Sequence, residues 1–188
     1  AVRRGAPDTH VIGDMPHRSY DTLETATANA RAFLSVGADS VKLEGAHPEI
    51  VAALIEDGTA VMGHVGLTPQ TMDGFAKRGK EPQEAEQFIR DAHQIEEAGA
   101  YALVIEHVPQ SLAESITEQL AIPTIGIGAG PGCDGQVLVT YDMLGLYGKF
   151  VPPFVRQYEQ LAATAQKACA AFVKDVRSGA FPDADEIR

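Results

Sequence analysis

Basic residues and cysteines are scarce in this sequence of 188 residues. Lysine and arginine together number 15 against 26 aspartates and glutamates, which gives a net charge of −11. An acidic chain of this kind is a poor ligand for nucleic acid or an anionic membrane surface, so we expect neither as a partner. The two cysteines, Cys133 and Cys169, are too far apart for a CxxC motif and too few for a disulfide scaffold. We therefore expect a reduced, cytoplasmic protein.

Long apolar runs are also missing. No stretch approaches the roughly 20 residues that a membrane span needs, and the first residues, AVRRGAPDTH, lack the hydrophobic region of a signal peptide. We expect no membrane partner. With 45% hydrophobic and 22% charged residues, the composition is ordinary for a globular protein with a core. These features predict a single domain over residues 1–188.

Apolar strand-like runs alternate with helical patterns along the chain. The predicted strands are 9–14, 39–44, 59–64, 101–106, 123–128 and 137–146. Helix starts are predicted at the capping pairs Asp21–Glu24 and Ser111–Glu114 and at Thr68–Pro69. The last pattern predicts a C-terminal helix over about 153–178, ended by Gly179. The alternation indicates parallel strands with crossover helices, either a doubly wound sheet or a (βα)8 TIM barrel of which about six units are visible.

The stretch GADSVKLEGA, residues 37–46, places two charged residues inside a predicted strand. Side chains alternate between the two faces of a strand, so Val41 and Leu43 share one face while Lys42 and Glu44 share the other. On an isolated strand, the charged face would simply be the one in contact with water. The neighbouring strands decide whether that explanation is sufficient.

Polar side chains recur at the carboxyl ends of four predicted strands: Asp14, Lys42 with Glu44, His64, and Glu106. In both candidate architectures, ligands bind at this end of the sheet. Carboxylate oxygens such as those of Asp14 and Glu44 suit Mg²⁺. A metal that chelates a 2-oxo acid stabilises an enolate, and Lys42 would add positive charge there. Glu106 follows an apolar run and is the expected base, whereas His64 is interpreted equally well as a structural residue or a substrate contact.

Three other histidines and one glycine-rich segment carry less information. His47, His93 and His107 fall in predicted helices or loops and are interpreted as incidental. The GIGAG segment at 126–130 resembles a dinucleotide-binding fingerprint only loosely, because it runs into Pro-Gly-Cys-Asp rather than a helix. We interpret it as a tight strand-to-loop passage.

The strings that carry a family resemblance extend along nearly the whole chain in order. They are AVRRGAP at 1–7, GDMP at 13–16, VKLEG at 41–45, GHVGLTPQ at 63–70, LVIEHVP at 103–109, IPTIGIGAG at 122–130 and DGQVLVTYDMLG at 134–145. Together they resemble the ketopantoate hydroxymethyltransferases, and GHVGLTPQ is especially specific.

The resemblance implies a (βα)8 barrel of the phosphoenolpyruvate/pyruvate type, assembled as a homo-oligomer, usually a decamer. It also implies Mg²⁺-dependent hydroxymethyl transfer from 5,10-methylenetetrahydrofolate to 3-methyl-2-oxobutanoate, giving 2-dehydropantoate for pantothenate biosynthesis. By motif position, Asp14 and Glu44 would belong to the metal site, and Asp14, Lys42 and His64 to the substrate pocket. Glu106 would be the proton acceptor.

Two departures from the family pattern are visible. The family's chain begins about two βα units earlier, with an aspartate-serine pair that has no counterpart here, so we expect these residues to belong to a longer polypeptide. The segment TMDGFAKRGKEPQE, at 71–84, is also shorter than in the family. Two alternatives remain: another Mg²⁺-dependent 2-oxo acid lyase or mutase of the same superfamily, and a non-catalytic barrel subunit.

Overall fold

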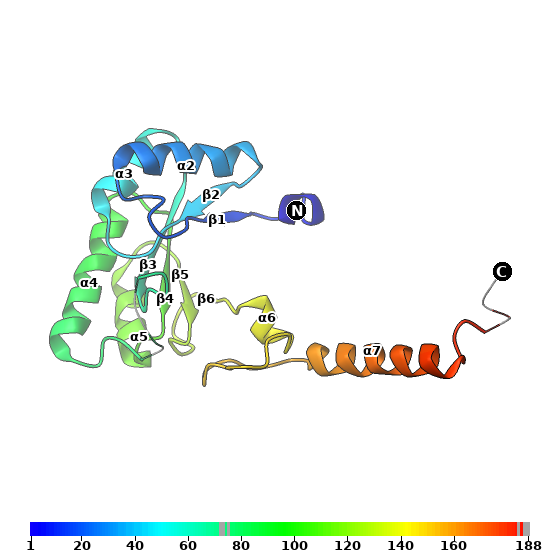
Figure 1. Cartoon of the computed structure of the whole chain (residues 1–188). Coiled ribbons are helices and arrows are strands. Elements are labelled where there is room, and N and C mark those ends of the chain that lie inside the picture. Colours follow the sequence, from blue (N-terminus) through cyan, green and yellow to red (C-terminus); the bar gives the residue numbers. More distant parts are fainter. Residues whose placement is uncertain (72–73, 75, 184, 186–188) are drawn as a thin grey trace. The chain divides into compact units, whose positions relative to one another are not determined.

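A six-stranded parallel sheet forms the centre of the first part of the chain. The computed structural model describes all residues except 72–73, 75, 184 and 186–188. The strands follow one another in the sheet in the same order as in the sequence (Figure 1). They are β1 (Ile12–Asp14), β2 (Ser40–Lys42), β3 (Val61–Gly66), β4 (Ala102–Glu106), β5 (Thr124–Ile127) and β6 (Gly135–Gln136). Each outer strand, β1 and β6, pairs with one neighbour within the described residues.

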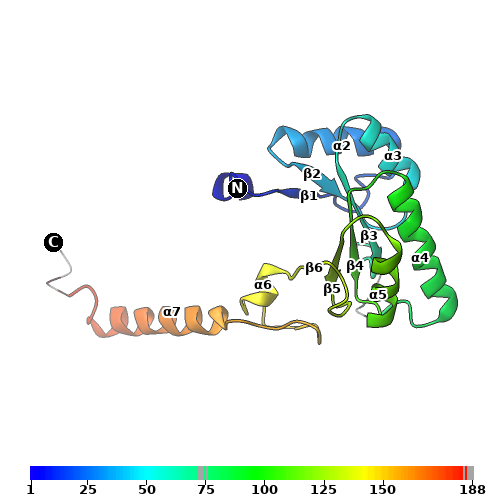
Figure 2. The ribbon, with the colours of Figure 1, turned by 180° about the vertical axis from the view of Figure 1, so that it is seen from behind.

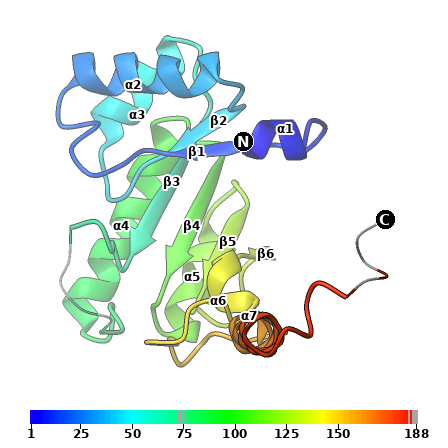
Figure 3. The ribbon, with the colours of Figure 1, turned by 45° about the vertical axis from the view of Figure 1, so that its right-hand side comes forward.

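Four helices follow the first four strands and lie on one face of this sheet, as the front and back views show (Figures 1 and 2). They are α2 (Leu23–Ser35), α3 (Pro48–Glu56), α4 (Pro82–Glu97) and α5 (Gln110–Gln119). A doubly wound sheet reverses its strand order and carries helices on both faces, whereas a barrel keeps one order and one helical side. The sheet is curled and singly wound (Figure 3), so the barrel prediction is confirmed for six strands.

The core lies between the sheet and these helices. Val41 and Leu43 are fully buried there, together with Leu103 and Ile105 of β4 and with apolar residues of α3, α4 and α5. Glycines admit close helix packing: a Cβ on Gly63 of β3 would overlap the Ile95 side chain of α4. Because side chains alternate along each strand, every second residue of the same strands must face away from the helices.

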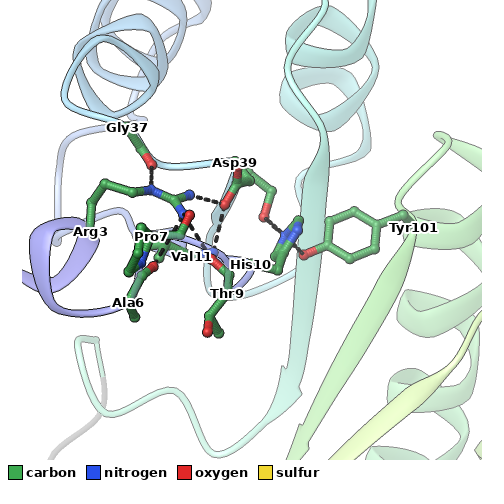
Figure 4. A network of polar contacts seen from close by, with 10 residues as sticks. Arg3, Ala6, Pro7, Thr9, His10, Val11, Gly37, Asp39 and Tyr101 are labelled. Carbon is green, nitrogen blue, oxygen red and sulfur yellow. Dashed lines mark hydrogen bonds and ion pairs between the residues drawn. The ribbon is translucent and has the colours of Figure 1, made fainter.

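The amino ends of the strands are closed by a polar network around α1 (Val2–Gly5) (Figure 4). The Arg3 guanidinium donates to the Asp39 carboxylate and, at 2.6 Å, to the Gly37 carbonyl. The hydroxyls of Ser40 and Tyr101 lie 2.9 Å apart, and His10 Nε2 is 2.9 Å from the serine oxygen. These contacts join β1, β2 and the start of β4 at the end of the sheet opposite to the predicted site.

The sixth predicted strand was wrong. Strand β6 covers only Gly135–Gln136, and within 137–146 a short helix, α6 (Thr140–Met143), replaces the predicted strand. The main-chain N–H groups of Asp142 and Met143 both donate to the Val139 carbonyl, which closes a local helical turn instead of a ladder. A short alternating apolar run does not distinguish these outcomes.

The predicted helix starts also needed correction. Thr22, not Asp21, is the N-cap of α2: Thr22 and Thr25 exchange two side-chain-to-main-chain hydrogen bonds of 3.2 Å. Helix α5 has Pro109 at its N-cap position and no side-chain cap. Thr68 begins a turn, in which the Thr71 N–H donates to the Thr68 carbonyl, and the next described helix is α4. Within the predicted shortened segment 71–84, residues 72–73 and 75 lie outside the described residues.

Residues Leu138–Arg188 form a second compact unit, separate from Ala1–Val137. It contains α6 and the C-terminal helix α7 (Leu161–Ser178), which begins later than the predicted 153 and ends at Gly179 with φ of 73°. The single domain over 1–188 stays a prediction. None of the helices in the described part of the chain combines the length and hydrophobicity of a membrane span.

Candidate functional site

The five residues predicted at strand ends share the sheet face turned away from the helices. We call this the inner face, and its site residues are Asp14, Lys42, Glu44, His64 and Glu106. A Cβ on Gly13 would overlap Phe33 of α2, so the next residue along β1 points the other way. On β2, β3 and β4 the residues that alternate with the site residues are buried against the helices, so the site residues point to the opposite face. Lys42 and Glu44 therefore face a polar surface that several strands share, rather than open solvent alone.

His64 lies between two glutamates on three neighbouring strands. Its Nδ1 is 3.9 Å from Glu44 Oε1, and its Nε2 is 3.3 Å from Glu106 Oε2. The Gly45 N–H donates to the His64 carbonyl at 3.0 Å, which sets the register of Glu44 beside His64. The side chains of Glu44, His64 and Glu106 are only 6%, 1% and 13% exposed, so little water reaches them. Both ring nitrogens of His64 face a carboxylate, but neither makes a hydrogen bond to the described residues.

Lys42 and Asp14 form an ion pair at the ends of β1 and β2. Their Cα atoms are paired in the sheet register, and Lys42 Nζ lies 2.7 Å from Asp14 Oδ1. The lysine side chain is 14% exposed and the aspartate 58% exposed. The pair therefore presents an ammonium group partly removed from water and a carboxylate open to a ligand.

Two residues that the sequence did not single out contact Glu44. The Gln70 main-chain N–H donates to Glu44 Oε2 at 3.1 Å. The Glu44 main-chain N–H donates to the Tyr20 hydroxyl at 3.3 Å. Gln70 belongs to the GHVGLTPQ string, which was a usable signal, whereas Tyr20 lies in a loop with no recognisable pattern.

A cavity of about 450 Å³ opens beside Glu44 at the carboxyl end of the sheet. It lies among the loops that follow β1, β2 and β3, and Tyr20, His47 and Thr68 contribute to its wall. The ring of His47 meets that of Tyr20 edge to face at 5.5 Å. His47 thus lines the cavity, although no local pattern indicated this.

The remaining singled-out residues lie elsewhere. His93 is on α4, 3.7 Å from Glu96. The His107 N–H donates to the Ile127 carbonyl, which joins the ends of β4 and β5. The glycine-rich segment 126–130 is a tight passage, as predicted: Gly130 has φ of 86° and its carbonyl accepts from the Gln136 side chain at 3.0 Å.

The inner face carries carboxylate oxygens, which are the ligands that hard divalent cations such as Mg²⁺ bind. Within the described residues, no group of three or more His, Cys, Asp and Glu side chains is arranged to hold a metal without other ligands. Mg²⁺ needs less, because it is commonly held by one or two carboxylates and completes its octahedron with water and substrate oxygens. Asp14 at the end of β1 and Glu44 just beyond β2 supply two carboxylates of this kind on the same face of the sheet.

The chain is similar to proteins of one known family along nearly its whole length. The family described as ketopantoate hydroxymethyltransferase matches residues 1–184. The 3-methyl-2-oxobutanoate hydroxymethyltransferase of Desulfotalea psychrophila is 49% identical over 192 residues, covering 98% of this chain and 69% of the relative. The enzyme of the same name from Thermus thermophilus is 47% identical over 188 residues, covering 97% and 72%.

Solved structures with low sequence identity support the fold alone. Phosphonopyruvate hydrolase superposes with a TM-score of 0.51 at 14% identity, covering 94% of this chain and 66% of that chain. A Burkholderia cenocepacia protein assigned as a phosphonomutase gives a TM-score of 0.55 at 14% identity, covering 89% and 70%. These superpositions agree with a parallel α/β barrel, of which six strands lie in the described residues. By the family match and these identities over nearly its whole length, the chain belongs to the ketopantoate hydroxymethyltransferase family, a family of one-carbon transferases.

Proposed function

We propose that the protein catalyses Mg²⁺-dependent transfer of a hydroxymethyl group from 5,10-methylenetetrahydrofolate to 3-methyl-2-oxobutanoate, which gives 2-dehydropantoate. The names of the relatives at 47% and 49% identity support the acceptor and the reaction. The observation that carries the proposal is the buried arrangement of Glu44, His64 and Glu106 on the inner face. The hydrolase and the phosphonomutase that share the fold are only 14% identical to this chain, which does not favour the lyase or mutase alternative.

Glu106 is the proposed proton acceptor. Its carboxylate lies at the carboxyl end of β4, 13% exposed, where it faces the inner side of the sheet. It would remove the proton from C3 of the oxo acid, and the resulting carbanion would form a C–C bond to the methylene carbon of the folate. Overall, both C–N bonds of that carbon break and one water molecule supplies the hydroxyl group. Tetrahydrofolate leaves with the C3 proton and one proton of the water on its two nitrogens. His64 Nε2 lies 3.3 Å from this carboxylate, and His64 is proposed to contact the substrate in the same pocket.

Lys42 is proposed to contact the oxo-acid oxygen on which negative charge develops. Stabilisation of developing charge is strongest when the positive group is already held in place and is partly shielded from water. The Asp14 carboxylate holds the Lys42 ammonium at 2.7 Å. Lys42 need not change position during the reaction.

Asp14 and Glu44 are the residues proposed to hold Mg²⁺. When bound, the cation would supply Lewis acidity to the oxo group of the substrate. Gln70 occupies one oxygen of Glu44 through its main-chain N–H, which leaves Oε1 for other contacts. The 58% exposed side chain of Asp14 leaves its carboxylate accessible from the solvent side.

The cavity beside Glu44 is the proposed location of the folate-borne one-carbon unit. Its volume of about 450 Å³ falls within the usual range of small-molecule sites, about 300–1,000 Å³. A ligand there would lie next to a residue of the proposed metal site. This supports a second substrate at the same end of the sheet.

A cytoplasmic homo-oligomer, a decamer by family resemblance, completes the proposal. The second unit exposes large apolar side chains, including those of Tyr141, Phe150 and Phe172. Association of several copies would remove such apolar area from water, which is favourable. Sedimentation equilibrium of the purified protein would test the assembly.

The chemistry is tested by deuterium exchange at C3 of 3-methyl-2-oxobutanoate, followed by NMR with Mg²⁺ and without folate. Exchange would support an enolising site made of the inner-face residues. Absence of exchange in a folded sample would contradict the proposal and favour a non-catalytic barrel subunit. Formation of 2-dehydropantoate on addition of 5,10-methylenetetrahydrofolate would distinguish the transferase from a lyase or mutase.

A further inference from the structure

The main chain of Glu44 lies where the pairing between β1 and β2 has ended. The last contact of that pairing is the Met15 N–H, which donates to the Lys42 carbonyl at 2.8 Å. In a parallel ladder, alternate residues bond to opposite neighbours, so the next groups to require a partner on the β1 side belong to Glu44. Toward β3, in contrast, the Gly45 N–H still bonds to the His64 carbonyl.

The Tyr20 hydroxyl occupies the place of the missing strand. It accepts from the Glu44 N–H at 3.3 Å and lies 3.5 Å from the Glu44 carbonyl oxygen, to which it donates. A phenol hydroxyl can both donate and accept a hydrogen bond, as these two contacts require.

Gln70 holds the other end of the same residue. Its main-chain N–H donates to Glu44 Oε2 at 3.1 Å, and its side-chain amide donates to the Met15 carbonyl at 3.1 Å. The second bond joins the turn that begins at Thr68 to the end of β1. A turn held in this way presents its N–H to the carboxylate in a fixed direction.

We infer that Tyr20 and Gln70 are positioning residues that hold Glu44 from both ends. Tyr20 fixes the main chain, Gln70 fixes Oε2, and Oε1 is left on the His64 side at 3.9 Å. Neither residue needs to touch the substrate. The inference rests on the function proposed above, because Glu44 is assigned there to the metal site.

The test compares Tyr20→Phe with a matched control, Tyr101→Phe. Both substitutions delete a phenolic hydroxyl that hydrogen-bonds within the fold, but Tyr101 bonds to Ser40 at the amino ends of the strands. The readouts are kcat and KM for C3 exchange, Mg²⁺ affinity by calorimetry without substrate, and the thermal unfolding midpoint.

We expect Tyr20→Phe to lower kcat and to weaken Mg²⁺ binding by about tenfold each, because small displacements of site groups have large effects. KM should change less, since the Lys42–Asp14 pair is retained. Tyr101→Phe should leave kcat and Mg²⁺ affinity unchanged while lowering the unfolding midpoint by a similar amount. Gln70→Ala removes the side-chain hydrogen bond to Met15 but keeps the main-chain N–H, and it should reproduce the effects of Tyr20→Phe. It serves as the test of the positioning role if Tyr20→Phe does not fold.

The outcomes separate the two claims. If the wild-type protein catalyses exchange and Tyr20→Phe lowers the exchange rate no more than Tyr101→Phe does, the positioning role is wrong and the proposed function stands. If Tyr20→Phe does not fold, a Gln70→Ala protein that exchanges at the wild-type rate would likewise overturn the positioning role. Absence of exchange in the wild-type protein would overturn the proposed function, and the positioning role with it.

Discussion

His64 Nε2 lies 3.3 Å from Glu106 Oε2, across the boundary between β3 and β4. The two residues are not opposite each other in the ladder: His64 is paired with Val104, and Glu106 with Gly66. The contact therefore runs diagonally across the ladder. The imidazole thus lies directly beside the carboxylate that is proposed to act as the base.

Glu106→Gln should abolish proton removal while preserving the shape of the site. The amide cannot accept a proton from C3, so we expect the exchange rate to fall by at least about 10²-fold. Binding of the oxo acid should persist because Lys42 is untouched. NMR exchange rates and calorimetric binding would measure both. Glu118→Gln, on the exposed side of α5, is the control. Exchange at the wild-type rate in the Glu106→Gln protein would show that Glu106 is not the base.

Asp14→Ala should weaken Mg²⁺ binding. Loss of a carboxylate from the proposed donor set is expected to reduce affinity by at least about tenfold, as changes around metal sites commonly do. Calorimetric titration with Mg²⁺ would show it. Asp8→Ala, an exposed carboxylate before β1, should bind as the wild type does. Equal affinities in the two variants would count against Asp14 as a ligand.

Gly63→Ala should destabilise the fold without adding or removing any polar group. The new Cβ would overlap Ile95 of α4 and approach Leu103 to 3.1 Å. Overpacking of this kind costs about 1–3 kcal/mol of unfolding free energy. Urea denaturation would measure the loss. Gly148→Ala is the control, since nothing lies within 4 Å of a Cβ there; a Gly63→Ala protein as stable as this control would show that α4 packs differently.

Glu84 should make stability depend on pH. Its hydrogen bond from the Arg78 guanidinium, and a further one from the Gly79 N–H at 2.6 Å, lower the pKa of the carboxyl below its ordinary value of 4.5. A lowered pKa in the folded state means that the stabilisation is present above pH 4.5 and is lost as the pH falls through the folded-state pKa.

Glu84→Gln should therefore lower the free energy of unfolding at pH 7 by about 1 kcal/mol or less, since both side chains are partly exposed. The difference from the wild type should shrink at pH 3. Glu86→Gln, on the exposed side of the same helix, should show no comparable change. A difference that grows on acidification would reverse the sign assigned to this contact.

Much of the sheet could be predicted from local pattern. The strands β1 to β5 lie within or next to their predicted ranges, because each is a short apolar run between turn-forming residues. The sixth strand failed because a short apolar run such as Val137–Val139 does not by itself distinguish a strand from a helical segment. Only the hydrogen bonds to the Val139 carbonyl distinguish the two.

The site also has features that local pattern predicts and features that it does not. Which residues share the inner face followed from the two-residue period of a strand, so Lys42 and Glu44 could be placed together from local pattern alone. That His64 would lie between Glu44 and Glu106 depended on the register of three strands, which no local pattern specifies.

The sequence by itself determined the order of strands and helices, the burial of one strand face and the residue types available at the strand ends. Only the tertiary structure decided that Tyr20 and Gln70 meet Glu44. Tyr20 and Gln70 are 24 and 26 residues away from Glu44 in the chain. The physical reason is that side-chain periodicity acts between near neighbours, whereas unsatisfied main-chain groups at a strand end are completed by whichever residues the folded loops bring to them.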